Sequence, residues 1–362
     1  MSFETKYFKL FGTCIPVKGQ KNASIYDLER RTLEIIPLDL FYVIHKLENK
    51  SSIVEIIDFY GKENSDIIGG YLDFLIEKEF GFYCDSEEFD FFPKIDLDFS
   101  LPNQVSNCIV ELDAFNKNRL ELIVNQLDSL GCLALNVISY YSMSEIDIKT
   151  IFDCLNNTRI KSLEVLTKYS EIHNQDFLKS ISGAKNRLTK ITFFGSPHNS
   201  SKNELNLLFK TIFSTKNIEN FKHCGTISID YFNVNRNKFL EAINYNSCLY
   251  KKISVDASGS IKNCPAMANN YGSIYSTKLE NVLKLDDYKK IGTIRKDEIS
   301  GCKNCEFRYA CTDCRAFLES PHNIFSKPLK CGYNPKTGVW EEWSSNPLKN
   351  KSIEHYGLLP LN

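Results

Sequence analysis

The sequence predicts an α/β protein in three parts, built around a parallel sheet that is open or curled into a partial barrel. Three observations predict it. Short apolar strands alternate with helical stripes through the middle of the chain, at the repeat length of a βα unit. The 362 residues suffice for two or three domains. Seven of the thirteen cysteines lie in the last third, where regular periodicity is weak.

The first part, residues 1–90, is expected to form a small sheet followed by three helices. Runs rich in Phe, Ile, Tyr and Thr over 7–17 and 24–37 are typical of strands, and Gly12 and the turn at 19–22 interrupt them. Apolar residues then keep helical spacing over 40–47, 53–57 and 67–75. This order of elements predicts a winged-helix-like domain.

The second part, residues 91–244, is expected to hold the parallel sheet. The candidate strands are 108–112, 133–138, 163–166, 191–194 and 226–229. The candidate helices between them are 120–130, 144–155, 177–181 and 205–213. Five or so βα units in a row favour parallel strands, because each crossover helix returns the chain to the same edge.

Charge and hydropathy exclude several classes of protein. Lys and Arg number 44 and Asp and Glu 45, so the basic excess of a nucleic-acid-binding protein is missing. No apolar run reaches the 18 or so residues of a membrane span, and the N-terminus lacks the pattern of a signal peptide. We therefore expect a cytoplasmic protein with reduced cysteines, no nucleic-acid partner and no membrane partner.

The third part, residues 245–340, carries the chemistry, and 341–362 is expected to be a C-terminal tail. Its cysteines form the patterns Cys248-x10-Gly259-x4-Cys264 and Cys302-x2-Cys305-x5-Cys311-x2-Cys314, with Cys331 after sixteen more residues. A Cys-x2-Cys pair turns two thiolates toward one point, which suits zinc or an iron–sulfur cluster. Seven ligands favour iron–sulfur clusters over four-coordinate zinc, but zinc stays an alternative. The lone cysteines are expected to be small buried apolar residues: Cys14, Cys84, Cys108, Cys132 and Cys154.

This cysteine pattern resembles the SPASM domain, the auxiliary-cluster domain of peptide-modifying radical S-adenosylmethionine enzymes. All seven cysteines and Gly259 match its motif, except that the Cys311–Cys314 interval is two residues rather than three. The resemblance implies one [4Fe–4S] cluster on Cys302, Cys305, Cys311 and Cys331. It implies a second [4Fe–4S] cluster on Cys248, Cys264 and Cys314, whose fourth ligand is unassigned. The family places a further cysteine near position 242, but this chain has Ala242 there. His223 and Cys224 are candidates for the fourth ligand.

A radical S-adenosylmethionine enzyme also needs a CxxxCxxC loop after its first barrel strand, and the sequence holds no such motif. Asp113-Ala114-Phe115-Asn116 follows the expected first strand directly. The second part therefore resembles a degenerate radical S-adenosylmethionine barrel, and we expect no radical S-adenosylmethionine activity.

This combination resembles the SPASM-domain peptide maturases of grasp-with-spasm systems, whose partners are a ribosomal precursor peptide and an ATP-grasp ligase. The N-terminal part resembles leader-binding modules, in which a peptide adds as a strand beside the third strand. The expected docking residues are Leu33, Glu34, Ile35 and Ile36. Three roles stay open: a scaffold that presents the precursor, a redox enzyme that uses its [4Fe–4S] clusters, and a zinc-stabilised adaptor.

Overall fold

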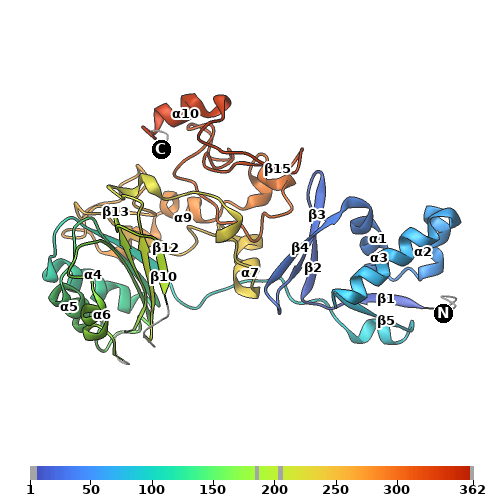
Figure 1. Cartoon of the computed structure of the whole chain (residues 1–362), viewed down its shortest axis with the longest axis horizontal. Coiled ribbons are helices and arrows are strands. Elements are labelled where there is room, and N and C mark those ends of the chain that lie inside the picture. Colours follow the sequence, from blue (N-terminus) through green and yellow to red (C-terminus); the bar gives the residue numbers. More distant parts are fainter. Residues whose placement is uncertain (1–5, 184–186, 203–206, 359–362) are drawn as a thin grey trace.

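The computed structural model describes residues 6–183, 187–202 and 207–358. Figure 1 shows an elongated molecule with an N-terminal lobe at one end, the large sheet at the other, and the C-terminal part alongside the region between them. It is a mixed α/β fold, as the sequence predicts.

The N-terminal lobe is a three-stranded antiparallel sheet with three helices and a separate two-stranded ladder. The sheet order is β2-β3-β4, and β1 pairs with β5. A shared apolar core of Phe8, Ile25, Ile36, Ile44 and Leu72 joins the strands to the helices. The elements are β1 Tyr7–Leu10, β2 Cys14–Lys18, β3 Asn22–Asp27, β4 Thr32–Pro37, α1 Leu38–Glu48, α2 Ile53–Tyr60, α3 Ser65–Glu77 and β5 Gly81–Cys84. The predicted order of strands and helices is confirmed.

The second part forms most of an eight-stranded sheet of order β10-β11-β9-β8-β7-β6-β12-β13. Its six inner strands are parallel, and the outer pairs β10–β11 and β12–β13 are antiparallel. Figure 1 shows α4, α5 and α6 gathered on one side of it. The elements are β6 Asn107–Leu112, α4 Lys117–Ser129, β7 Ala134–Ser139, α5 Glu145–Leu155, β8 Ser162–Lys168, α6 Gln175–Ser180, β9 Leu188–Phe194, β10 Ser200–Lys202 and β11 Lys210–Ser214.

The two faces of this sheet differ in character, because side chains alternate along each strand. Val110, Val137, Val165 and Ile191 point to the helices and are buried in one large apolar core. The opposite face carries polar residues in register, and there Lys190 lies 2.5 Å from the Glu164 carboxylate on the neighbouring strand.

Two predicted elements of the second part are wrong. Of the expected helix over 205–213, residues 210–213 belong to strand β11, which pairs with β9 on one side and β10 on the other. Residues 207–209 have no regular structure, and residues 205 and 206 lie outside the described residues. The expected strand over 226–229 makes only a single bridge, from Ile227 to Cys331, before a 3₁₀ turn at Ile229–Tyr231.

The C-terminal part has little regular structure and packs on both other parts. Its first strands, β12 Lys252–Val255 and β13 Ile261–Lys262, complete the large sheet beside β6. The other elements after them are α8 Leu279–Lys284, α9 Asp286–Gly292, β14 Tyr333–Asn334, β15 Val339–Trp340 and α10 Asn350–His355, while α7 Arg236–Asn244 ends the second part. The segment 341–362, expected as a tail, packs through Trp343, Ile353 and Leu358 onto Phe317 and Leu329 where it is described.

The N-terminal sheet contacts the C-terminal part next to one of the predicted ligands. The Ser24 and Tyr26 hydroxyls on β3 donate to the carbonyl oxygen of Glu306, at 2.9 and 2.8 Å. Arg308 donates to the Lys18 carbonyl at 2.7 Å. Since Glu306 follows Cys305, this interface fixes the position of a cysteine backbone.

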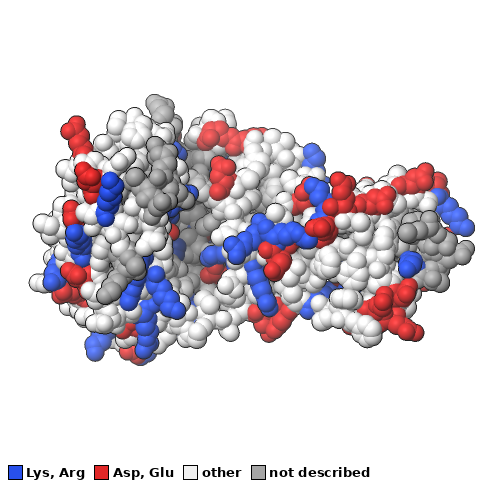
Figure 2. All heavy atoms as spheres, turned by 60° about the horizontal axis from the view of Figure 1, so that its bottom comes forward, with Lys and Arg blue, Asp and Glu red and all other residues white. Residues whose placement is uncertain are grey.

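The surface carries basic and acidic side chains together (Figure 2), in line with the nearly equal numbers of the two in the sequence. Figure 2 shows Lys and Arg side chains intermixed with Asp and Glu over the face it presents. In the described part of the chain, none of the helices has the length and apolar character that crossing a membrane requires.

Candidate metal centre

Four of the predicted ligands meet around one small cavity in the C-terminal part. Cys302, Cys305, Cys311 and Cys331 line it together with Lys296 and Tyr333. We call these four residues the first cysteine group. Cys302, Cys311 and Cys331 are buried, and Cys305 is half-buried.

Local turns explain how the first group converges. Gly301, with φ of +78°, leads into a 3₁₀ turn over Cys302–Asn304, and the Cys305 N–H donates to the Cys302 carbonyl at 2.9 Å. The turn carries the thiols of residues i and i+3 to the same side. The Cys311 N–H donates to Phe307 at 3.1 Å, which closes the next turn. The Cys331 carbonyl accepts from the Lys349 ammonium at 2.7 Å.

The other three predicted ligands and the candidate Cys224 lie in a neighbouring region. Cys248 and Cys264 pack against one apolar cluster that contains Leu249 and Ile291. The backbone at Gly225, next to Cys224, lies so close to Cys314 that an added Cβ would be 2.8 Å from its Sγ. We call Cys224, Cys248, Cys264 and Cys314 the second cysteine group.

A buried polar network shapes the short Cys311–Cys314 interval. Asp313 and Arg315 form a fully buried ion pair at 2.7 Å. Asp313 also accepts from the Asn246 amide at 2.5 Å, and the Asn246 side chain in turn accepts from the Cys248 N–H at 3.0 Å. This network therefore ties the turn between the two groups to the loop that presents Cys248.

Burial makes four of these thiols, those of Cys302, Cys305, Cys311 and Cys314, hard to ionise without a counter-charge. Burial raises the pKa of Cys302 and of Cys314 to about 12, and it raises the pKa of Cys305 and Cys311 as well. A metal that binds thiolates takes the place of the thiol protons, so it relieves this penalty.

A lysine lies beside each group. Lys252, on β12, has its Nζ 3.5 Å from the Cys248 Sγ. Lys296 is 2% exposed, and its ammonium donates to the Cys311 carbonyl at 3.3 Å. Burial lowers the pKa of both lysines, but the neighbouring thiols outweigh it and the net pKa of each is raised. Neither lysine has a sequence signal beyond its place near a cysteine, and sequence reasoning missed both.

The described residues include no set of three His, Cys, Asp or Glu side chains arranged to hold a single metal ion. The two four-cysteine groups are compatible with that finding, because a cubane cluster holds its thiolates farther apart than one zinc ion does.

The remaining cysteines lie apart from both groups. Cys14, Cys84, Cys108 and Cys132 are buried and Cys154 is half-buried. Cys14 packs in the N-terminal core, and Cys108, Cys132 and Cys154 pack in the core of the large sheet. They are small apolar residues, as predicted.

The end of β6, where a radical S-adenosylmethionine enzyme carries its cluster loop, is closed by protein contacts. Four residues, 113–116, join β6 to α4, and the Asn116 side chain caps the helix by accepting from the Arg119 N–H at 3.0 Å. The Arg119 guanidinium donates to the Ala257 carbonyl at 2.5 Å and to the Glu111 carbonyl at 3.3 Å. The Tyr140 hydroxyl donates to the Glu111 carboxylate.

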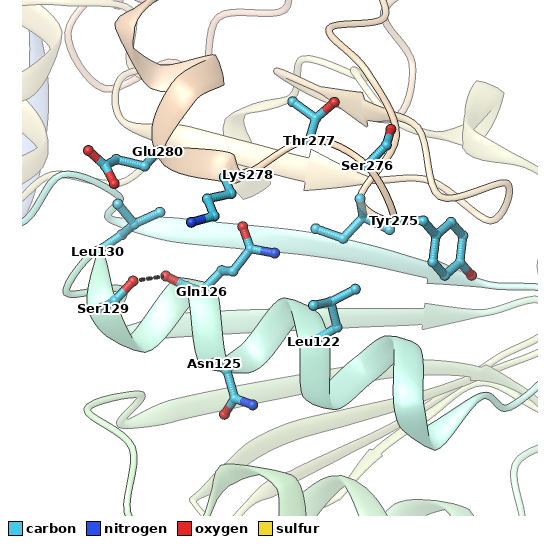
Figure 3. Close-up of a pocket in the computed structure, with 11 residues that line it drawn as sticks. Leu122, Asn125, Gln126, Ser129, Leu130, Tyr275, Ser276, Thr277, Lys278 and Glu280 are labelled. Atoms are coloured by element: carbon cyan, nitrogen blue, oxygen red, sulfur yellow. Dashed lines mark hydrogen bonds between the residues drawn. The ribbon is translucent and has the colours of Figure 1, made fainter.

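A more open pocket lies elsewhere. Its volume is about 530 Å³, and it lies between α4 and the segment before α8 (Figure 3). The Ser129 hydroxyl donates to the Gln126 carbonyl at 2.7 Å within it. It contains no cysteine or histidine, so its volume alone does not make it a reactive site. Its lining residues are Leu122, Asn125, Gln126, Ser129, Leu130, Ile274, Tyr275, Ser276, Thr277, Lys278 and Glu280.

Comparison with known proteins does not assign the chain to a family. No protein-family model matches it, and no curated protein matches it. Among the solved structures that match, two crystal structures of one protein align over most of this chain. The crystal structure of Streptococcus suis SuiB is 12% identical, with 88% of this chain and 98% of that chain covered and a TM-score of 0.39. SuiB bound to S-adenosylmethionine is also 12% identical, with 90% and 98% covered and a TM-score of 0.40. Likeness at this level carries no functional argument.

Proposed function

We propose that this chain is a maturation protein for a ribosomally synthesised peptide, that it holds two [4Fe–4S] clusters, and that it works with an ATP-grasp ligase. The observation that carries the proposal is the convergence of Cys302, Cys305, Cys311 and Cys331 on one small cavity, in the part of the chain whose pattern resembles a SPASM domain.

The donor chemistry supports iron–sulfur clusters. Each group offers only thiolates, which is the usual ligand set of a [4Fe–4S] cluster. The cluster with its thiolates is anionic, and Lys296 and Lys252 supply positive charge beside the first and second groups. When bound, such clusters supply one-electron transfer. The residues of this chain fix the ligands, compensate their charge and limit the access of water.

The N-terminal sheet supports a peptide partner. β4 is the last strand of its sheet, so its outer edge offers backbone donors and acceptors to an extended peptide. Ile35 on this strand is 51% exposed, so its side chain is accessible to a peptide docked on β4. Ile36 faces the domain core and Glu34 pairs with Lys78 at 3.3 Å, so they would position the strand rather than contact the peptide's apolar side chains.

The same strand lies next to the first cysteine group. Leu33 on β4 packs against the apolar cluster that contains Phe307, Cys311 and Cys331. A precursor docked on β4 would therefore lie close to one proposed cluster. This proximity favours a protein that presents the precursor and keeps open a redox role, because an electron-transfer group near the substrate is what such an enzyme needs.

The metal content tests the cluster proposal. The full chain, purified without oxygen and reconstituted with iron and sulfide, should carry about eight iron atoms and be brown. A colourless protein with stoichiometric zinc would contradict the iron–sulfur proposal and favour a zinc-stabilised adaptor.

The partner proposal needs its own assay. The assay uses the precursor and the ATP-grasp ligase that we expect neighbouring genes to encode, and it measures ligation with and without this chain. A scaffold raises the ligation rate while leaving the precursor otherwise unmodified. A redox enzyme yields a mass change in the precursor without the ligase. The reduced chain should leave S-adenosylmethionine intact, because the loop at 113–116 has no thiolates; enzymatic release of 5′-deoxyadenosine would contradict this.

A further inference from the structure

We propose that Cys224 is the fourth thiolate of the second cysteine group, so that Cys224, Cys248, Cys264 and Cys314 form a closed, all-cysteine cluster site. This inference rests on the cluster binding proposed above and deepens it. Cys224 stands 24 residues before Cys248, on the segment that follows the large sheet, so no short spacing motif includes it.

Direct contact places the Cys224 segment on the second group. A Cβ atom added at Gly225 would lie 2.8 Å from the Cys314 Sγ, so the backbone beside Cys224 touches that thiol. Gly225 has φ of +85°, a conformation that favours glycine. The chain therefore uses glycine where a side chain would push Cys314 away.

Two further contacts hold this segment in place. The Cys224 carbonyl accepts from the Lys330 ammonium at 2.8 Å. Three residues on, the Ile227 N–H donates to the Lys330 carbonyl at 3.1 Å, within the bridge from Ile227 to Cys331. The segment is thus fixed against the chain that leads into the first cysteine group.

A shared apolar cluster links this contact to the rest of the group. Cys314 and Ala266 pack against the same cluster, and Ala266 follows Cys264 by two residues. The Lys252 Nζ lies 3.5 Å from the Cys248 Sγ in the same group.

The neighbouring histidine makes a different contact. The His223 Nδ1 lies 2.5 Å from the Asn220 carbonyl oxygen, within its own turn. A thiolate is also the softer and anionic ligand, which iron–sulfur clusters prefer. Cys224 is therefore the better fourth ligand.

Four thiolates have a functional consequence. A site with four cysteine ligands leaves no iron free for a substrate group or for S-adenosylmethionine. The second cluster would then serve electron transfer or structure, and the alternative of substrate ligation at this site would fail.

Cysteine substitutions in the full chain test the inference. In Cys224→Ala we expect iron to fall from about eight to about four atoms per chain, or the second cluster to give the electron paramagnetic resonance signal of a three-iron form. Cys248→Ala should behave alike, and Cys154→Ala, a lone half-buried cysteine, should match the native protein. A Cys224→Ala variant with native iron content and a native spectrum would overturn the inference. If the native chain itself binds no cluster, the proposed function fails instead.

A measurement on the native chain serves where the alanine variant does not fold. Cys224 is the one cysteine that is exposed as a residue, so iodoacetamide can report on it by mass spectrometry. Cys224 should react many-fold faster after a chelator has removed the iron than in the cluster-loaded chain. An unchanged rate would overturn its role as a ligand.

Discussion

Replacing Lys252 with methionine should lower the reduction potential of the cluster proposed at the second cysteine group. Lys252 reaches this group from β12, where its backbone is held by pairing with β6 and by the Tyr288 hydroxyl, which donates to its carbonyl at 2.5 Å. Its ammonium lies 3.5 Å from the Cys248 Sγ. Reduction adds negative charge to the cluster, and a nearby ammonium stabilises that charge. Methionine keeps the length of the side chain and removes the charge.

Coulomb's law sets the size of the effect. Two unit charges 3.5 Å apart interact by about 5 kcal/mol at an effective dielectric constant of about 20. That value is an upper limit, because an added electron spreads over the iron and sulfide atoms behind the thiolate. If roughly 2 kcal/mol of this interaction between the Lys252 ammonium and the added electron acts on the cluster, removing the charge lowers the reduction potential by about 90 mV for a one-electron couple.

A potentiometric titration followed by electron paramagnetic resonance measures this shift directly. Lys252→Arg keeps the charge and should stay near the native potential. Lys190→Met is a matched control on the same sheet face, four strands away and therefore about 19 Å distant in the hydrogen-bonding direction. A Lys252→Met potential that equals the native one, with both clusters intact, would refute the reasoning.

Three other predictions concern the thiol contact, the buried histidine and the edge strand. Gly225→Ala should displace Cys314 and lower the iron content by about four atoms per chain. Gly195→Ala is the control, because Gly195 also has a positive φ but no atom lies within 3.8 Å of its added Cβ. This variant should keep its iron. Burial lowers the pKa of His173, whose folded state needs a neutral ring that accepts from the Ser170 N–H at 3.1 Å. The stability that the neutral ring contributes is present above the unfolded pKa of about 6.5 and is lost as the pH falls below it. The midpoint temperature of thermal unfolding should therefore change less between pH 7.5 and pH 5.5 in His173→Gln than in the native protein. Ile35→Pro should weaken precursor binding by the full chain in calorimetry, since proline removes a backbone donor and disfavours strand pairing; equal affinity in a folded variant would place the peptide elsewhere.

The spacing of apolar residues along the sequence was enough to predict the helices and strands that bury one face against a core. The N-terminal order of strands and helices and the first strands of the large sheet follow from apolar spacing, because each buries one face against a shared core. The third helix shows the limit of that rule: Ile68, Leu72 and Leu75 are buried, but Ile67, in the same predicted stripe, is 56% exposed.

Elements that depend on distant partners were beyond such patterns. β11 is a strand because β9 and β10 flank it, although its sequence neighbourhood has helical spacing. The division of the seven predicted cysteines into two sets is what the resemblance to the SPASM domain implies, and the place of Cys224 beside Cys314 depends on the tertiary fold. Lys252 and Lys296 likewise gain their positions from tertiary structure, and no spacing rule connects them to a thiol.

The positions of the two cysteine groups relative to β4 and β12 suggest different roles for the clusters proposed there. The first cysteine group shares an apolar cluster with Leu33 of the exposed edge strand, so it lies on the side where a precursor would dock. The second group lies beside β12 of the large sheet, where Lys252 approaches it. The backbone between Cys311 and Cys314 joins the two, and the buried Asp313–Arg315 pair fixes it. If both groups hold clusters, the buried ion pair would hold the segment that joins them in one conformation, and a precursor docked on β4 would lie on the side of the first group.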